Sequence, residues 1–205
     1  MMIRGACQQD APQLATLIYA SGPVLIESVF ACTQQHNAQG FLLSAASHEF
    51  GQYGFANHFV AVENEQVLGS VCAWHTELNA SFAQATLHSV VQYFGLELSL
   101  EVVARSQIIK HFISPPLNHE WCIGHFAVFP QYRRQGVARR LLQFMTELAQ
   151  NSGKTTLSLH VAANNHSAIK FYQQQGFNLN STAELTTEMQ GLGFAAHWHM
   201  QKKLV

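Results

Sequence analysis

The segment from 122 to 138 contains residue types that could bind a pyrophosphate. An apolar stretch, Cys-Ile-Gly-His-Phe-Ala-Val-Phe, is followed by Pro130 and by a turn that holds Arg133, Arg134 and Gly136. A helix that begins after this turn would present amide N–H groups without partners inside the helix, at the end that the helix dipole makes partly positive. Glycine lets a ligand approach the backbone closely. The segment therefore predicts an anion site at the start of a helix.

The elements around this turn alternate between strand and helix. We predict strands at 121–128, 155–161, about 176–180 and 197–204, and helices at 137–151 and 165–174. This alternation indicates a mixed sheet flanked by helices, with the first two of these strands parallel through a right-handed crossover. Ligands of such sheets bind at the carboxyl ends of the strands, where the strand order diverges. The arginine-rich turn lies at that end.

The first 120 residues supply further elements. We predict a strand at 3–4, a helix at about 10–20, short helices at 24–31 and 41–46, an antiparallel hairpin at 57–62 and 66–74, and helices at 82–94 and 99–112. Gly95 separates the last two helices, and Pro115-Pro116 stops the second. We expect 75–118 to be a helical insertion within one domain that spans 1–205, because no repeat or low-complexity tract sets it apart.

Two motifs resemble those of the GNAT superfamily of acyl-CoA-dependent N-acyltransferases. The first, Arg/Gln-x-x-Gly-x-Gly/Ala, is matched by Arg133, Gly136 and Ala138. The second, Asn-x-x-Ala-x-x-Phe-Tyr followed by Gly-Phe, is matched by Asn165, Ala168, Phe171, Tyr172, Gly176 and Phe177. Two motifs in the expected order are more specific than a single glycine-rich turn. The resemblance implies a GNAT-like α/β (α+β) domain with an acetyl-CoA-binding core at 121–179.

The resemblance also implies roles for the turn and the strand before it. Backbone N–H groups from Arg134 to Ala138 would hold the diphosphate of acetyl-CoA, and the side chains of Arg133 and Arg134 would add charge-assisted contacts. Backbone groups of Phe126 and Val128, on a strand that splays from its neighbour, would pair with the pantetheine arm, and one of these amides would donate to the thioester oxygen. The residues expected to bind the cofactor are Phe126, Ala127, Val128, Arg133, Arg134, Gln135, Gly136, Val137, Ala138, Asn165 and Tyr172.

The second motif supplies an expected catalytic acid. By resemblance, Tyr172 would protonate the departing CoA thiolate; the competing interpretation is an ordinary half-buried aromatic residue. Asn165 would either cap the helix that follows it or bond the pantetheine.

A general base is less clearly marked. The family often uses a carboxylate on the strand that leads to the turn. Here Cys122 stands two places nearer the turn than Glu120, so the usual acid is displaced or absent. Counting alternate residues back from Val128 leads to Glu120 and leaves His125 on the opposite face. Glu120 is therefore the predicted base, with a solvated glutamate at a strand end as the alternative.

Twelve histidines raise the question of a metal. His197-x-His199 would place two imidazoles on one side of a strand, and His58, His119 and His160 could approach them in the fold. Local spacing fixes no third ligand, so we expect no metal. The four cysteines form no Cys-x-x-Cys pair and are expected to be buried thiols: Cys7, Cys32, Cys72 and Cys122.

Composition excludes several partners. The net charge is −1 and the pI is near 6.9, which gives no electrostatic attraction for nucleic acid or an anionic membrane. No apolar run of about 18 residues occurs and the amino terminus has no secretory pattern, so we expect a cytoplasmic protein without membrane association. Charged residues make up only 11% of the chain, which favours self-association as a homodimer.

The predicted function is transfer of an acetyl group from acetyl-CoA to a primary amine, by direct attack in a ternary complex without a metal. By resemblance the acceptor would lie near 22–56 and 75–118, where acids are few, so we expect a small molecule, an amino acid or a peptide amino terminus rather than a polyamine. Aromatic residues there could line the acceptor site, although core packing is favoured: Phe30, Phe41, Phe50, Tyr53 and Phe55. The alternatives are a non-catalytic acyl-CoA-binding or sensor protein and, less strongly, a metal-dependent hydrolase.

Overall fold

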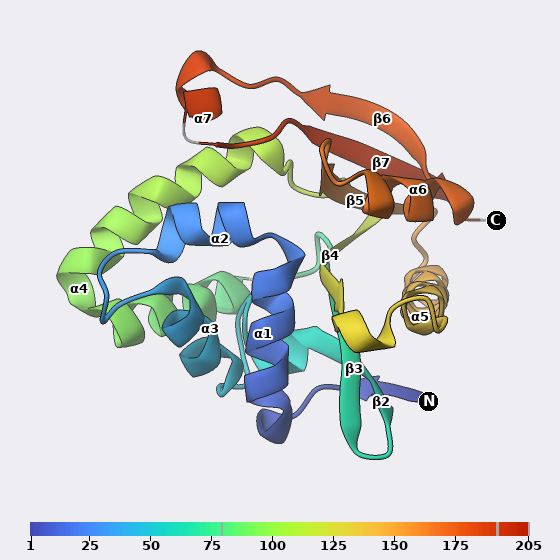
Figure 1. The fold of residues 1–205 in the computed structure, drawn as a ribbon, viewed down its shortest axis with the longest axis horizontal. Coiled ribbons are helices and arrows are strands. Elements are labelled where there is room, and N and C mark those ends of the chain that lie inside the picture. Colours follow the sequence, from blue (N-terminus) through green and yellow to red (C-terminus); the bar gives the residue numbers. More distant parts are fainter. Residues whose placement is uncertain (79, 192, 205) are drawn as a thin grey trace.

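The computed structural model describes residues 1–78, 80–191 and 193–204, which form a seven-stranded mixed sheet with helices on both faces (Figure 1). The strands are β1 (Met2–Gly5), β2 (His58–Glu63), β3 (Gln66–Trp74), β4 (Glu120–Val128), β5 (Thr156–Ala162), β6 (Asn178–Ala183) and β7 (His197–Lys203). The helices are α1 (Ala11–Ser21), α2 (Pro23–Phe30), α3 (Ala38–Ala46), α4 (Ala80–Phe112), α5 (Val137–Asn151), α6 (His166–Gln174) and α7 (Thr187–Gly191).

The strand order is β1-β2-β3-β4-β5-β7-β6. The β4–β5 pair is parallel, and each other neighbouring pair of the described strands is antiparallel. The predicted mixed sheet and the predicted parallel pair are both confirmed. Helix α5 supplies the crossover between β4 and β5, as the alternation of elements required.

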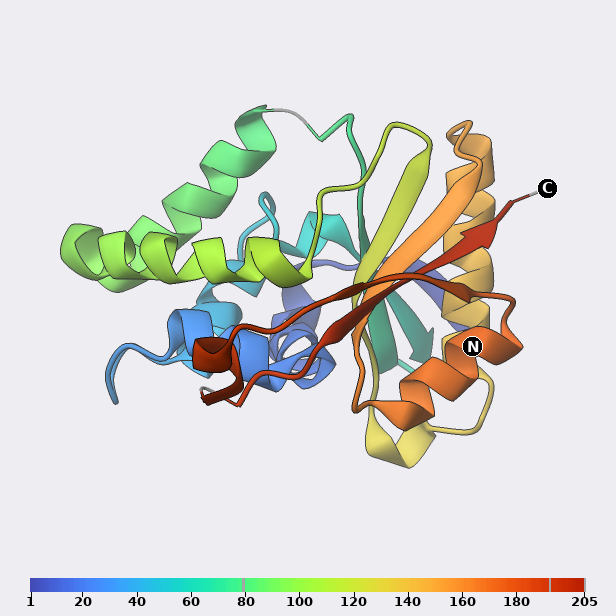
Figure 2. The same ribbon diagram turned by 90° about the horizontal axis from the view of Figure 1, so that it is seen from above.

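Two hydrophobic cores lie on opposite faces of the sheet. Helices α1 to α4 pack over one face, where α1 presents Leu14, Leu17 and Ile18 at helical spacing. Helices α5 and α6 pack over the other face, to which α5 contributes Leu141 and Met145. Figure 2 shows the sheet between these two layers. The two faces are hereafter called the α1–α4 face and the α5–α6 face.

The predicted insertion is helical, with a sharp break at Gly95, whose φ of 73° and ψ of 170° are not helical. The second arm of α4 starts directly after Gly95 rather than at 99, so the predicted four-residue gap was wrong. The two arms run in different directions in Figure 2. Strand β6 lies slightly later than predicted, and α7 was not predicted, because its five residues give too short a pattern to read.

Strand β4 carries a bulge that the sequence did not reveal. Ser70 pairs with Ala127 and Cys72 pairs with Gly124, so one residue of β3 faces two residues of β4. His125 occupies the extra position with a φ of +43°. A bulge interrupts the regular alternation of side chains along a strand. As a result Trp121 and Ile123 share the α5–α6 face with Phe126 and Val128.

This bulge corrects the count of alternate residues made from the sequence. Phe126 and Glu120 do not share a face, and His125 lies on the α1–α4 face, where Cys72 and His58 also lie. The simple count assumed an unbroken strand and was therefore wrong for the residues before the bulge.

Among the described helices none alone has the length and hydropathy of a membrane span. One bent pair, Gln8–Ser21 with Pro23–Phe30, passes that test together by length and composition only.

Candidate active site

A gap opens between β4 and β5 as the two strands approach the turn. Their pairing ends at Ile123 and Leu159. Beyond that point, residues 124–128 of β4 pair with β3 alone and residues 160–162 of β5 pair with β7 alone. The Phe129 N–H donates to Leu68 of β3 at 3.0 Å, so by alternation the backbone groups of Val128 and Phe126 point into the gap. The splayed strand expected from the resemblance is therefore present.

The turn at the mouth of the gap presents free backbone amides. Arg134 and Gly136 both have a positive φ, of 60° and 82°, which turns successive N–H groups towards one side. Among the described residues, the N–H groups of Arg134, Gln135 and Gly136 have no acceptor. A Cβ on Gly136 would meet no atom within 4 Å, so the space above this backbone is open. The geometry fits an anion with several oxygens.

Two side chains of the turn donate hydrogen bonds to nearby backbone carbonyls. Arg133 Nε donates to the Val128 carbonyl at 3.1 Å, which places the guanidinium beside the gap. Gln135 Nε2 donates to the Gln131 carbonyl at 2.9 Å. Arg134 is exposed. Arg133 therefore already contacts one of the backbone oxygens that face the gap.

Helix α5 fixes the position of the turn. Val137, its first residue, is 3% exposed and belongs to the α5–α6 core, while Ala138 is partly buried. Because Val137 is packed in the core, the amides of the residues before it are held in position beside the carboxyl end of β4.

Tyr172 of α6 lies on the α5–α6 face, close to the strand that lines the gap. Its ring lies 6.2 Å from the ring of Phe126 and 5.7 Å from that of Phe177, measured between centroids. Among the described residues, no protein group bonds its hydroxyl. Burial raises the pKa of Tyr172 above its ordinary value, so the hydroxyl keeps its proton at neutral pH.

Asn165 caps α6. Its Oδ1 accepts a hydrogen bond from the Ala168 N–H at 3.2 Å, which is the capping alternative foreseen from the sequence. The pantetheine contact stays a prediction.

Glu120 is buried at the start of β4, and its carboxylate is well bonded. It accepts from the Leu117 N–H at 3.0 Å and from Gln201 Nε2, and His199 Nε2 lies 3.9 Å from Oε1. Glu120 is 2% exposed, so the alternative of a solvated glutamate was wrong. Glu120 and Phe126 are six positions apart on the strand, about 20 Å at 3.3 Å per residue. The carboxylate cannot itself reach a group bound beside Phe126.

Two imidazoles connect Glu120 with the gap. The rings of His199 and His160 stack with centroids 4.6 Å apart and planes 8° apart. His160 stands on β5 directly after its last pairing with β4, where the gap begins. Burial, and then the neighbouring His199 and His197, lower the pKa of His160 to about 4, so its ring is neutral near pH 7.

These imidazoles line a cavity of about 200 Å³ on the α1–α4 face. The end of α4, β5 and the β6–β7 hairpin enclose it. Its lining residues are Lys110, His111, Phe112, Ser114, His160, Ser181, Thr182, Ala183, His197 and His199. This volume is below the roughly 300 Å³ of a small drug-sized pocket, so the cavity suits one end of a molecule.

A second imidazole pair lies on the β3 side of the gap. His58 Nδ1 lies 2.9 Å from the Gly54 carbonyl, and His58 Nε2 lies 3.0 Å from His125 Nδ1. Burial lowers the pKa of both rings, that of His58 to about 4. The only pattern of two neutral rings that satisfies both contacts has His125 donating to His58 and His58 donating to Gly54.

Comparison with known proteins decides the family. The sequence profile of the Acetyltransferase (GNAT) family matches residues 33–177, more than half of the chain. The chain belongs to the GNAT acetyltransferase family. Ribosomal protein bS18-alanine N-acetyltransferase of Salmonella typhimurium is 31% identical over 110 residues, which are 52% of this chain and 72% of that protein. The enzyme of that name from Escherichia coli strain K12 is 32% identical over 81 residues, which are 40% of this chain and about half, 55%, of that protein.

Solved structures agree with the GNAT fold. A crystal structure titled acetyltransferase superposes over 100% of both chains with a TM-score of 0.70 and 23% identity. An N-acetyltransferase from Staphylococcus aureus Mu50 superposes over 98% of this chain and 100% of its own with a TM-score of 0.65 and 19% identity. At these identities the likeness concerns the fold.

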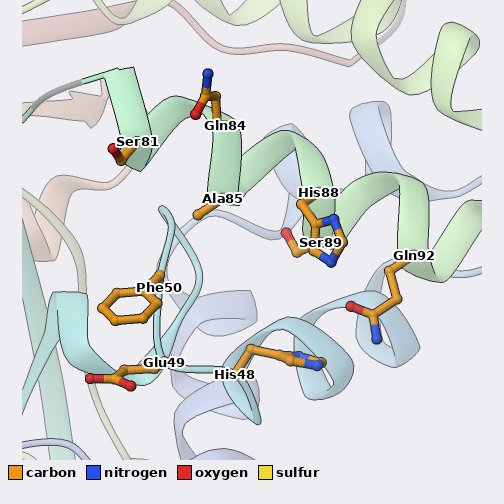
Figure 3. A pocket seen from close by; sticks show the side chains of 9 residues that line it. All are labelled: His48, Glu49, Phe50, Ser81, Gln84, Ala85, His88, Ser89 and Gln92. Carbon is orange, nitrogen blue, oxygen red and sulfur yellow. The ribbon is translucent and has the colours of Figure 1, made fainter.

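A larger cavity of this GNAT chain lies apart from the gap. It has a volume of about 410 Å³ and is bounded by the loop at 48–50 and the first arm of α4 (Figure 3). None of its lining residues belongs to the sheet or to the turn. The smaller cavity, in contrast, adjoins the gap through His160.

The aromatic residues predicted near the acceptor are mostly core residues of the GNAT domain. Phe30 and Phe41 are buried, and Tyr53 and Phe55 pack against the same core, as the favoured interpretation predicted. Phe50 is 67% exposed and lines the larger cavity. Of the cysteines, Cys72 and Cys122 are buried, whereas Cys7 and Cys32 are only partly so.

The sequence placed three of the five histidines correctly, since His160, His197 and His199 line one cavity, and was wrong for His58 and His119. His160 and His199 do meet, but His58 pairs with His125 on the other side of the gap, and His119 is exposed. His160 was overlooked as a reactive residue, because its place at the start of the gap depends on the register of β4 against β5. The sequence did show that His160 is near the carboxyl end of the strand that follows the α5 crossover, which is the end where ligands bind.

Proposed function

We propose that this GNAT protein transfers the acetyl group of acetyl-CoA to a primary amine by direct attack in a ternary complex. The observation that carries the proposal is the unpaired gap between β4 and β5, which leads to a turn with free amides. An extended, amide-bearing arm can add to the open edge of β4, and a diphosphate can lie on the turn. A solved structure of similar fold, yncA from Salmonella typhimurium, is titled as holding acetyl-CoA; it superposes over 100% of this chain with a TM-score of 0.55 and 14% identity.

The proposed cofactor site comprises the backbone of 126–128 and of 134–138, with Arg133 and Arg134 adding positive charge. The amide of Phe126 or Val128 would donate to the thioester oxygen. A donor fixed in place where negative charge develops is worth about 3 kcal/mol of transition-state stabilisation.

Tyr172 is the proposed acid. The leaving thiolate needs a proton, and the Tyr172 hydroxyl keeps its proton at neutral pH and has no other partner among the described residues. Transfer of that proton leaves a tyrosinate, which solvent must reprotonate before the next turnover. Proton donation of this kind contributes about 10² to 10⁴ in rate.

The proposed base is His160, with Glu120 and His199 as positioning residues. Glu120 was the predicted base, but its distance along β4 favours an indirect role. His160 has a neutral ring at the start of the gap and lines the smaller cavity, so it can take the proton that the amine nitrogen loses once attack on the thioester has made that nitrogen acidic. Burial lowers the pKa of His199, and the Glu120 carboxylate beside it opposes this effect, so Glu120 favours positive charge on the ring that stacks on His160.

The proposed acceptor enters through the smaller cavity with its amine first. The cavity admits one end of a molecule, which suits an amino acid, a small amine or a peptide amino terminus. The bS18-alanine N-acetyltransferases among the relatives act, by their names, on an alanine of a protein, which supports the peptide.

Two measurements test this proposal. Calorimetric titration should give one acetyl-CoA site per chain, and a thiol-release assay should then give turnover with at least one member of a panel of small amines, amino acids and alanyl peptides. A chain that does not bind acetyl-CoA would refute the assignment. Tight binding without turnover on any amine would favour the alternative of an acyl-CoA sensor.

A further inference from the structure

The structure assigns a transition-metal site to His58, Cys72 and His125, three side chains contributed by three neighbouring strands. One potential ligand atom from each residue lies within 4.8 Å of the other two. Two imidazole nitrogens and one thiolate sulfur form a donor set that suits Zn²⁺, Co²⁺ or copper and does not suit Mg²⁺ or Ca²⁺. No residue of this set takes part in the proposed acetyl transfer.

The register of the sheet brings the three residues together. His58 of β2 pairs with Cys72 of β3, and Cys72 pairs with Gly124 of β4. The bulge then turns the next side chain, that of His125, onto the same face. Strand pairing thus holds together residues that are 14 and 53 positions apart in the chain.

The spacing of the atoms fits an ion after a small adjustment. Metal–nitrogen bonds of about 2.0–2.1 Å and metal–sulfur bonds of about 2.3 Å separate tetrahedral ligand atoms by about 3.3–3.6 Å. His58 Nε2 and His125 Nδ1 are 3.0 Å apart and have to separate by only a few tenths of an ångström. An upper limit of 4.8 Å on the distances to the sulfur leaves them within reach of a small rotation of the Cys72 side chain.

The surroundings supply the outer contacts that metal ligands usually have. His58 Nδ1 lies 2.9 Å from the Gly54 carbonyl, which fixes the ring with Nε2 turned towards the site. Burial raises the pKa of the Cys72 thiol, and the Gly124 N–H directed at this sulfur offsets part of that effect. The Tyr53 ring stacks on His125 with centroids 5.3 Å apart and covers one side. His58 and Cys72 are fully buried, whereas His125 is partly exposed and offers a route of entry.

The proton balance of binding is simple. The Cys72 thiol gives its proton to solvent as the thiolate–metal bond forms. The proton on His125 Nδ1 leaves that atom and His125 Nε2 takes one up, so this ring stays neutral. His58 keeps its proton on Nδ1. One proton is therefore released for each ion bound.

Cobalt is a spectroscopic probe of this site. We expect protein freed of metal by chelator dialysis to bind one Co²⁺ per chain, with a sulfur-to-cobalt charge-transfer band in the near ultraviolet. Cys72→Ser should abolish this band. His125→Gln should weaken binding more than about 100-fold, since removal of an outer-shell partner alone costs about 10- to 100-fold. Cys32→Ser, at a partly buried thiol on the loop after α2, is the matched control and should leave the band unchanged.

Three results would overturn the site. They are the absence of the band at millimolar Co²⁺, a band that persists in Cys72→Ser, and a band that is lost in Cys32→Ser. If Cys72→Ser does not fold, X-ray absorption of the zinc-loaded natural protein decides. One sulfur at about 2.3 Å with nitrogen at about 2.0 Å supports the site, and a shell without sulfur refutes it.

These readouts do not depend on acetyl transfer. Protein that binds cobalt but transfers no acetyl group would refute the proposed function alone. Active protein that binds no cobalt would refute the metal site alone.

Discussion

The two ends of the β4–β5 gap present different chemical groups to a ligand. At the cofactor end, the ligand-facing groups are backbone amides of a turn whose side chains are mostly exposed. At the acceptor end, they are side chains that range from exposed to buried and come mostly from four elements, namely α4, β5, β6 and β7. A backbone site tolerates variation in most of its side chains but not in its one glycine. A side-chain site depends on each residue and on the register that joins the strands.

The largest effect is expected at the cofactor end, from Gly136→Glu. A carboxylate would occupy the space of the diphosphate and repel it, so acetyl-CoA affinity should fall at least about 100-fold, or about 2.7 kcal/mol. Calorimetry measures this loss, and circular dichroism checks the fold.

Gly153→Glu is the matched control. Gly153 also has a positive φ, of 70°, and open space around its Cβ position, but it lies beyond the far end of α5. Both variants strain the backbone similarly. Equal losses of affinity would show that the defect is general, and the turn would lose its assignment.

Tyr172→Phe tests the residue that packs near Phe126, between the two ends of the gap. Turnover should fall by about 10² to 10⁴, with acetyl-CoA affinity nearly unchanged, because only the acid is removed. Steady-state thiol release and calorimetry measure the two quantities. Tyr132→Phe, which removes a hydroxyl bonded to Gln66, should leave both unchanged. A normal rate in Tyr172→Phe would mean that water protonates the thiolate.

The acceptor end should respond in turnover but not in cofactor binding. We expect His160→Gln to lower turnover about 100-fold as a lost base. Glu120→Gln should lower it about tenfold, the equivalent of one pKa unit of support for charge on the imidazole pair. The same assays apply. A loss of acetyl-CoA affinity in either variant would remove the distinction between the two ends.

The smallest expected effect concerns pH. The pKa of His160 is about 4, and the neutral ring is the base, so activity should be lost by protonation of this ring only as pH falls towards 4. At saturating amine, the turnover number should therefore show no histidine limb between pH 5.5 and 7. A limb near the ordinary histidine value of about 6.5 would point to a different base.

This contrast also explains what the sequence could reveal. The turn, Gly136 and the helix after it follow from local spacing, so they were predictable, as were most elements and the parallel β4–β5 pair. Asn165 was predictable as a cap for the same reason. The meeting of His160 with His199 requires the pairing of β5 with β7, which lie far apart in the chain.

The bulge shows most clearly what local patterns miss. The residue types around His125 do not indicate an extra position, because that position depends on how β4 pairs with β3, a strand distant in the chain. The predicted face of Glu120 relative to Phe126 was therefore wrong, and the contact of His125 with His58 was not predicted. Predictions of side-chain sites are wrong when the strand register is wrong, whereas the prediction of the turn amides does not depend on that register.

The extra residue in β4 divides the strand into two halves of opposite parity. Before it, odd-numbered residues such as Ile123 look towards α5; after it, even-numbered residues such as Phe126 do. Deleting one residue between 124 and 126 would restore a plain strand and leave the residues that precede it on their present faces. Trp121 and Ile123 would still turn towards α5, and Glu120 and Cys122 towards α1–α4. A related chain that keeps the full length of β4 but straightens the strand would instead exchange the two faces for every residue before the extra position.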